Sequence, residues 1–164
     1  MHYESNLDYA EPSLQRKGRY MRDRVVTLTI PGDPIAKARA RIRYGFQKRF
    51  YDIQHLEKTR LQMYLSSEFN GGPMFEGPCE MDMTFCMPIK KTHRVLEGSY
   101  HSYRPDADNL EKWIMDLCTG VIWADDCIVS VLSCRKIYSE NPRTIVIINE
   151  LPYAETEKSK KNKK

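Results

Sequence analysis

The chain has 164 residues and a formal net charge of +4, with 29% charged and 41% hydrophobic residues. A chain of this length fits one domain with extensions, and it can bury enough apolar surface to fold without disulfides or a structural metal. No apolar run approaches the roughly 18 residues that a membrane-spanning helix needs, so a membrane protein is not expected.

The five cysteines include no C-x-x-C pair, and the four histidines are scattered along the chain. This distribution lacks the ligand spacing of zinc sites. The N-terminal residues carry acids and lack the basic and apolar regions of a secretion signal. The sequence therefore predicts an intracellular, cytoplasmic protein without disulfides or zinc.

The positive charge is concentrated at the C-terminus, because the last seven residues contain five lysines and the remainder has a formal charge of −1. The overall charge therefore says little about DNA binding, and the clustering of charges matters more. We predict a polar extension over residues 1–23, one folded domain over 24–152 and a disordered Lys-rich tail over 153–164.

The first predicted elements of the folded domain are strands. The β-branched run at 25–30 predicts a strand that ends at Pro31-Gly32. Residues 37–44 alternate strictly between basic side chains and others, which predicts a second strand. Residues 48–51 are expected to pair back on that strand as a hairpin.

The remaining pattern predicts two helices among further strands. Residues 52–67 lack Gly and Pro and are rich in helix formers, and the helix pattern at 110–118 has an apolar stripe on one face. Strands are predicted at 80–87, 127–137 and 144–148, and a long polar loop at 90–103. This order predicts an α+β or mixed α/β fold, a small single domain with a mainly antiparallel sheet and two helices.

Carboxylates gather around the second predicted helix. Asp106 and Asp108 stand two residues apart after a proline, and an extended segment would point both to the same side. Asp125 and Asp126 precede the next strand. Crowded carboxylates without His or Cys suit Mg²⁺, or Mn²⁺ in its place, which can activate water against a phosphate. Lys112 would add a positive charge for the transition state.

Structural roles also account for these residues when each is taken separately. Asp108 with Glu111 matches a D-x-x-E capping box at a helix start. Lys112 stands at the spacing of a helical ion pair with Asp108, and Asp116 is a second possible partner. The acids at 125–126 fit a turn before a strand.

The carboxylate pattern carries a family resemblance. The run from Asp106 to Lys112, followed by Asp116, Gly120 and the acids at 125–126, resembles the D-x-D-N-L-x-K…D…G…DD signature of the RusA-type Holliday junction resolvases. Flanking features over roughly residues 24–150 are similar to that family as well. The extension and the Lys-rich tail have no counterpart in its shortest members.

The resemblance implies a small mixed α/β fold, a homodimer, Mg²⁺, and paired cuts in four-way DNA junctions, in a bacterial or phage-encoded protein associated with the nucleoid. Carried over residue by residue, Asp106, Asp108 and Asp126 match the metal-binding aspartates, and Lys112 matches the catalytic lysine. Asp125 matches the neighbouring acid, whose role is open.

Two basic surfaces are candidates for DNA contact. If 37–44 is a strand, four cations lie on one of its faces, at a spacing that can follow a phosphate backbone. The alternative is a solvated edge strand. The loop before the carboxylates adds further cations and two tyrosines, Tyr100 and Tyr103, unless it is simply a solvated loop. The predicted DNA-binding residues are Lys37, Arg39, Arg41, Arg43, Lys90, Lys91 and Arg104.

The sequence therefore favours a dimeric, Mg²⁺-dependent endonuclease that resolves four-way DNA junctions. One alternative is a metal-dependent nuclease for other DNA structures. Another is a basic DNA-binding module without catalysis, in which the acids serve only as caps and turns.

Overall fold

The computed structural model describes residues 24–38, 41–43, 49–51, 54–70, 72–89 and 96–152, and these belong to one compact unit, Asp23–Tyr153. The predicted extension over 1–23 and the predicted tail over 153–164 lie outside the described residues. Among the described helices, neither is long and apolar enough to cross a membrane.

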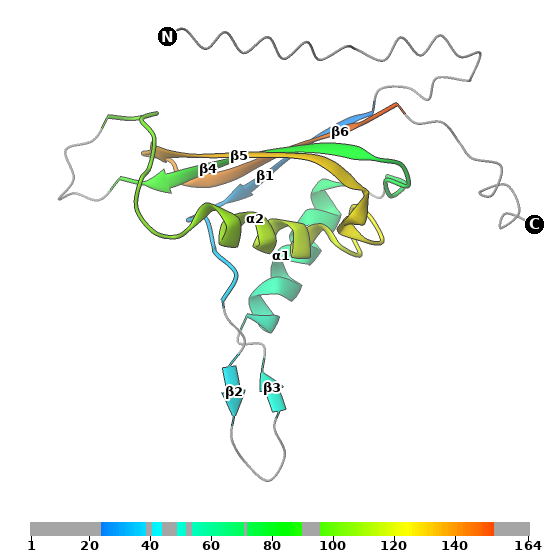
Figure 1. Ribbon diagram of the computed structural model, residues 1–164, viewed down its shortest axis with the longest axis horizontal. Coiled ribbons are helices and arrows are strands. Elements are labelled where there is room, and N and C mark those ends of the chain that lie inside the picture. The colour runs from blue at the N-terminus through cyan, green and yellow to red at the C-terminus, as the bar shows by residue number, and fades with distance from the viewer. Residues whose placement is uncertain are drawn as a thin grey trace, which may run out of the picture. The chain divides into compact units, whose positions relative to one another are not determined.

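The described residues form a mixed sheet with two helices. In chain order the elements are β1 Val25–Pro31, β2 Arg41–Arg43, β3 Arg49–Tyr51, α1 His55–Glu68, β4 Cys79–Pro88, α2 Ala107–Cys118, the 3₁₀ turn η1 Asp126–Ile128, β5 Val129–Ser139 and β6 Arg143–Glu150 (Figure 1). This confirms the predicted α+β class with two helices.

The main sheet has the strand order β1-β6-β4-β5. β6 pairs antiparallel with both β1 and β4, whereas β4 and β5 run parallel. A parallel pair requires a crossover, and α2 lies in that crossover. α2 therefore begins toward the carboxyl end of β4 and ends toward the amino end of β5, which fixes where its two ends lie (Figure 1).

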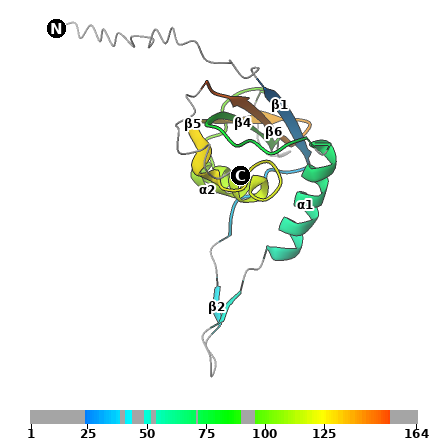
Figure 2. The ribbon, with the colours of Figure 1, turned by 90° about the vertical axis from the view of Figure 1, so that its right-hand side faces the viewer.

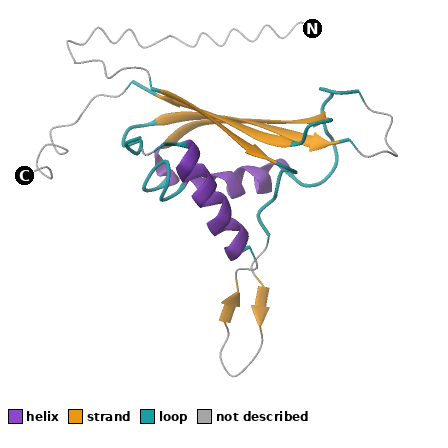
Figure 3. Cartoon of the chain, turned by 180° about the vertical axis from the view of Figure 1, so that it is seen from behind, coloured by secondary structure: helices purple, strands orange, loops and turns teal. Residues whose placement is uncertain are grey.

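The core lies between the sheet and the two helices, which cover the same face (Figures 2 and 3). Alternation along β4 places Met81, Met83 and Phe85 on that face with no exposed surface. α2 contributes the predicted apolar stripe, whose members are all buried: Leu110, Trp113, Ile114, Leu117 and Cys118. The stripe orients α2, so that its opposite side faces solvent.

The hairpin prediction is confirmed in part. β2 and β3 pair antiparallel with each other. The predicted strand over 37–44 is wrong at its start, because Lys37 and Ala38 lie outside any strand. The backbone N–H of Lys37 donates to the carbonyl of Asn109 over 2.9 Å, and that of Ala38 donates to Oε1 of Gln54 over 2.6 Å. Contacts with the two helices thus replace strand pairing here.

Candidate active site

Asp106 and Asp108 lie at the amino end of α2. Asp106 is the N-cap residue with extended backbone angles, φ −70° and ψ 144°, and Asp108 is already inside the helix. The expectation that both stand in one extended segment is therefore wrong. The carboxylates share a helix end instead, where the helix dipole favours negative charge.

The capping box predicted for Asp108 is also wrong, because the helix begins before that residue. The N-cap residue, Asp106, makes no side-chain hydrogen bond to the helix end. Both side chains belong to exposed residues. Neither carboxylate is thus committed to closing the helix, and both are accessible to a ligand.

Lys112 stands one turn further along α2, next to Asp108. Its Nζ donates to Oδ2 of Asp108 over 3.1 Å, which confirms the helical ion pair. Their side chains are 60% and 59% exposed, so the pair contributes little to stability. The hydrogen bond from Lys112 lowers the pKa of Asp108, which keeps this carboxylate ionised beside an accessible ammonium.

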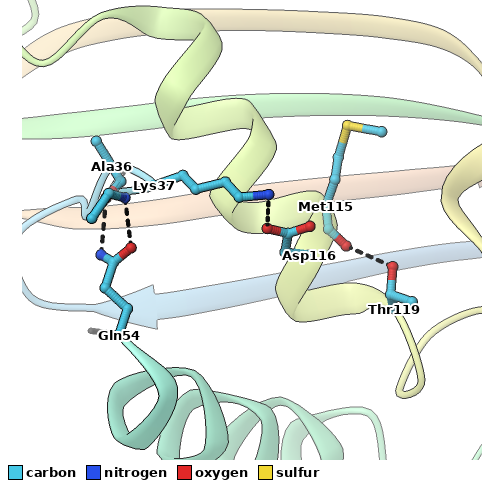
Figure 4. Close-up of polar contacts among 7 residues, drawn as sticks. Ala36, Lys37, Gln54, Met115, Asp116 and Thr119 are labelled. Atoms are coloured by element: carbon cyan, nitrogen blue, oxygen red, sulfur yellow. Dashed lines mark hydrogen bonds and ion pairs between the residues drawn. The ribbon is translucent and has the colours of Figure 1, made fainter. Parts of the chain in front are cut away.

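An open pocket of ≈ 430 Å³ lies beside Asp106, and its lining residues are Ala36, Lys37, Arg104, Pro105, Asp106 and Asn109. The segment before β2 forms one wall. Nζ of Lys37 forms an ion pair with Oδ2 of Asp116 at 2.5 Å (Figure 4). Gln54 holds the same segment, because its amide donates to the carbonyl of Ala36 over 3.0 Å.

The other wall of the pocket is fixed to β5 by Lys136. Its Nζ donates to the carbonyl oxygens of Tyr103 and Pro105, each over 2.8 Å. Sequence reasoning assigned no such role to Lys136 or Gln54. The sequence did carry a signal for Lys136. It shares a face of β5 with Cys134 and Tyr138, and at such a position an apolar residue is expected.

Asp125 and Asp126 occupy different positions around η1. Asp125 is its N-cap residue, and Oδ1 accepts the backbone N–H of Cys127 over 2.9 Å. That hydrogen bond lowers the pKa of Asp125. The predicted turn role is therefore confirmed for Asp125. Asp126 is the first residue of η1 and is half-buried.

The segments that carry the predicted aspartates lie toward opposite ends of α2: residues 106–108 are at its start, and η1 follows the loop after its carboxyl end (Figure 1). A 12-residue helix is about 18 Å long. Asp106 and Asp108 are at its start. At its end, the Ile122 N–H donates to the carbonyl of Cys118 over 2.8 Å, which holds the loop toward η1 against the carboxyl end. One chain thus brings Asp106 and Asp108 together and leaves Asp126 apart.

The donor atoms at the amino end of α2 fit Mg²⁺. In the described part of the chain, no three His, Cys, Asp or Glu side chains are grouped so that they could hold a metal ion. Mg²⁺, however, needs only one or two carboxylates beside waters and substrate phosphates. Asp106 and Asp108 supply two accessible carboxylates of that kind. The assignment of Asp126 to the same metal stays a prediction.

The predicted basic surfaces are only partly described. Arg104 lines the pocket beside Asp106. Arg41 and Arg43 lie in β2. Lys37 does not continue their strand, so the predicted row of four cations does not begin with it. Arg39, Lys90 and Lys91 lie outside the described residues.

Comparison with known proteins identifies the family of this chain. The family model described as Endodeoxyribonuclease RusA matches residues 31–149. The uncharacterized protein YqaN of Bacillus subtilis (strain 168) is 28% identical over 137 residues, which cover 77% of this chain and 96% of that relative. The family match includes every aspartate discussed above.

Proposed function

Because the chain belongs to the RusA family of endodeoxyribonucleases, we propose that it resolves four-way DNA junctions by paired, Mg²⁺-dependent hydrolysis of phosphodiester bonds. The observation that carries the proposal is the accessible pair Asp106 and Asp108 at the amino end of α2, with the Lys112 ammonium 3.1 Å from Asp108. A DNA-binding module without catalysis would not need two accessible carboxylates there, because they repel phosphate.

In this proposal Asp106 and Asp108 hold the metal ion. Bound Mg²⁺ supplies Lewis acidity toward the phosphate and neutralises negative charge as the bond breaks. Lys112 offers its ammonium to the same phosphate, where charge develops in the transition state. Arg104, in the wall of the pocket, would hold an adjacent phosphate in register.

Symmetric cuts in two strands require two active sites with two-fold symmetry, which a homodimer supplies. The separation along α2 supports the same assembly. If Asp126 is the third metal-binding aspartate, as the family resemblance implies, the place of η1 toward the carboxyl end of α2 favours a site that is completed by Asp126 of the partner subunit.

The edge of the main sheet offers a surface for that partner. Among the described elements, β5 is an edge strand whose outer side is bridged only near Ile137, by Tyr100. Val131 and Leu132, further toward its amino end, are 44% and 42% exposed. An open edge with exposed apolar residues is a template for pairing with another chain.

Antiparallel pairing of the amino-terminal halves of two β5 edges, which the segment at 98–101 leaves open, would bring the amino end of one strand toward the carboxyl half of the other. η1 with Asp126 lies at the amino end. The segment before Asp106 is tied to the carboxyl end by Lys136. This pairing therefore supports an active site in which Asp106 and Asp108 of one subunit meet Asp126 of the partner subunit.

The activity test uses a labelled four-way junction and a linear duplex of the same sequence, with Mg²⁺ or with EDTA. We expect symmetric cuts in the junction with Mg²⁺ only, and none with Asp108→Asn. Cutting of both DNAs at similar rates would instead identify a nuclease for other structures. Binding to DNA without cutting in every condition would contradict the nuclease proposal.

In the dimer test, two inactive variants, Asp106→Asn and Asp126→Asn, are mixed and allowed to exchange subunits. If the site is shared, one of the two sites in each mixed dimer is intact, so single-strand nicking returns. If each chain carries its own site, the mixture stays inactive. Val131→Asp, which puts a charge into the β5 edge, is expected to give a monomer in sedimentation analysis.

A further inference from the structure

The segment just before Asp106 presents two tyrosines to solvent. Tyr100 is 80% exposed and Tyr103 is 62% exposed. An exposed aromatic ring offers a flat face on which another aromatic group can stack. Since Tyr103 precedes Asp106 by three residues, the two Cα atoms are at most about 10 Å apart.

The backbone that carries these rings is fixed. Tyr100 forms an antiparallel bridge with Ile137. The N–H of His101 donates to the carbonyl of Lys136, and the N–H of Tyr138 donates to that of Ser99, each over 2.9 Å. Ordering two aromatic side chains on a fixed strand edge reduces the entropy cost of binding.

A further support comes from the ring contacts of Tyr103. Its ring meets that of His101 edge-on at a centroid distance of 6.1 Å. His101 in turn lies 4.7 Å from the ring of Tyr138, which is 3% exposed. The exposed Tyr103 is thus the outer member of an aromatic row that reaches the core, so its ring is held in place.

Glu97 anchors the other end of this segment. Its carboxylate accepts the Ser139 hydroxyl over 2.9 Å and the N–H of Glu140 over 2.6 Å. Together with Lys136, which holds the carbonyls of Tyr103 and Pro105, this contact fixes residues 97–105 to β5. The backbone of both tyrosines is therefore held on a rigid support, which continues into the pocket-lining residues Arg104 and Pro105.

From this arrangement we propose that Tyr100 and Tyr103 form a stacking surface for unpaired DNA bases next to the cut phosphate. The inference rests on the proposed function and adds how branched DNA is distinguished from duplex. Bases in a continuous duplex stack on their neighbours, whereas bases at a branch point can leave the stack and pack on an aromatic ring. Arg104 and Lys112 supply cations for the same strand.

A subunit contact is the competing explanation, because the β5 edge beside this segment is the surface proposed for dimerisation. A base is favoured here for two reasons. Tyr103 is the immediate neighbour of Arg104, which lines the pocket beside Asp106, and this flanking side chain is a cation rather than an apolar residue.

The test uses Tyr100→Ala with Tyr103→Ala in an Asp106→Asn protein that binds without cutting. We expect junction affinity to fall about tenfold or more, while duplex affinity changes less than about twofold. The matching double Tyr→Phe variant keeps the ring faces and should retain affinity. Met63→Ala on α1, which removes another exposed apolar side chain, is the control.

A fluorescent base analogue, 2-aminopurine, reports on stacking directly when it is placed at the branch point. Binding should change its emission, and the change should be lost with the Ala variant and kept with the Phe variant. Equal losses of junction and duplex affinity, or no loss, would overturn the inference. So would a monomeric Ala variant in sedimentation analysis, which would assign the tyrosines to the dimer.

The proposed function is judged separately, by Mg²⁺-dependent junction cleavage with the unmodified protein. If that protein cuts junctions and the tyrosine variants bind and cut as it does, only the stacking inference fails. If it cuts nothing, yet the Ala variant still loses junction affinity and the 2-aminopurine signal, the stacking surface stands and the nuclease proposal fails.

Discussion

The two helices cover the same face of the sheet but are used differently. α2 buries five side chains along one stripe, whereas α1 buries only Leu65 and leaves Leu56 and Met63 exposed at 84% and 71%. α2 carries the candidate active site at its amino end. The candidate site is thus built on the helix whose orientation the core fixes more firmly. This suits a site that must hold a metal ion and a phosphate in a fixed geometry.

The largest expected effect is on stability. Trp113 on α2 is 3% exposed, so Trp113→Ala should lower the free energy of unfolding by about 3–5 kcal/mol. Met63→Ala on α1 should change it by less than about 0.5 kcal/mol. Urea unfolding measures both. Similar losses for the two variants would contradict the contrast between the helices.

The next effect is on catalysis, and each helix offers an acid at its amino end. Asp106→Asn at α2 should reduce Mg²⁺-dependent DNA cleavage by about 100-fold or more, because a metal-binding carboxylate is lost. Glu57→Gln in the first turn of α1 should leave the cleavage rate unchanged. The cleavage rates of the two variants are compared in single-turnover reactions with a labelled junction. A reduced rate for Glu57→Gln would contradict the prediction, because it would assign α1 to the active site.

A smaller effect is expected where the helices end. Gly120 after α2 has φ +82°, and Asn70 after α1 has φ +50°. A Cβ at Gly120 meets no atom within 4 Å, so Gly120→Ala should cost only the left-handed backbone strain, about 1–2 kcal/mol. Asn70→Gly should stabilise the protein slightly. Thermal unfolding checks both signs.

The smallest effect concerns the charge of Asp108. Lys112→Ala removes the hydrogen bond that lowers its pKa, so the pKa should rise toward the ordinary 3.8. Because the folded pKa is lowered, the ion pair stabilises the protein above the unfolded pKa and loses its effect as pH falls through the folded value. Carboxyl NMR signals followed during a pH titration measure the shift. An unchanged pKa would mean that Lys112 does not contact Asp108 in solution.

The sequence by itself determined the strand and helix types and the face of α2. The apolar residues of α2 recur at helical spacing: Leu110, Trp113, Ile114, Leu117 and Cys118. Such a stripe can be recognised locally, because it will be buried whichever sheet the helix packs on. The alternation along β4 was readable for the same reason. The family signature around Asp106 also predicted the residues of the candidate active site.

The tertiary structure decided what the patterns left open. Lys37 alternates with its neighbours as a strand residue does, yet contacts with Asn109 and Asp116 hold it against α2. The local alternation of side chains does not predict such partners, because they come from a distant part of the chain.

The distance between the aspartates was decided in the same way. In the sequence Asp126 follows Asp106 by twenty residues, and nothing in that spacing says whether the two meet. The parallel pairing of β4 and β5 requires a crossover, and α2 within it carries the chain from one end of the strands to the other. That connection places Asp106 at the amino end of α2 and Asp126 after its carboxyl end.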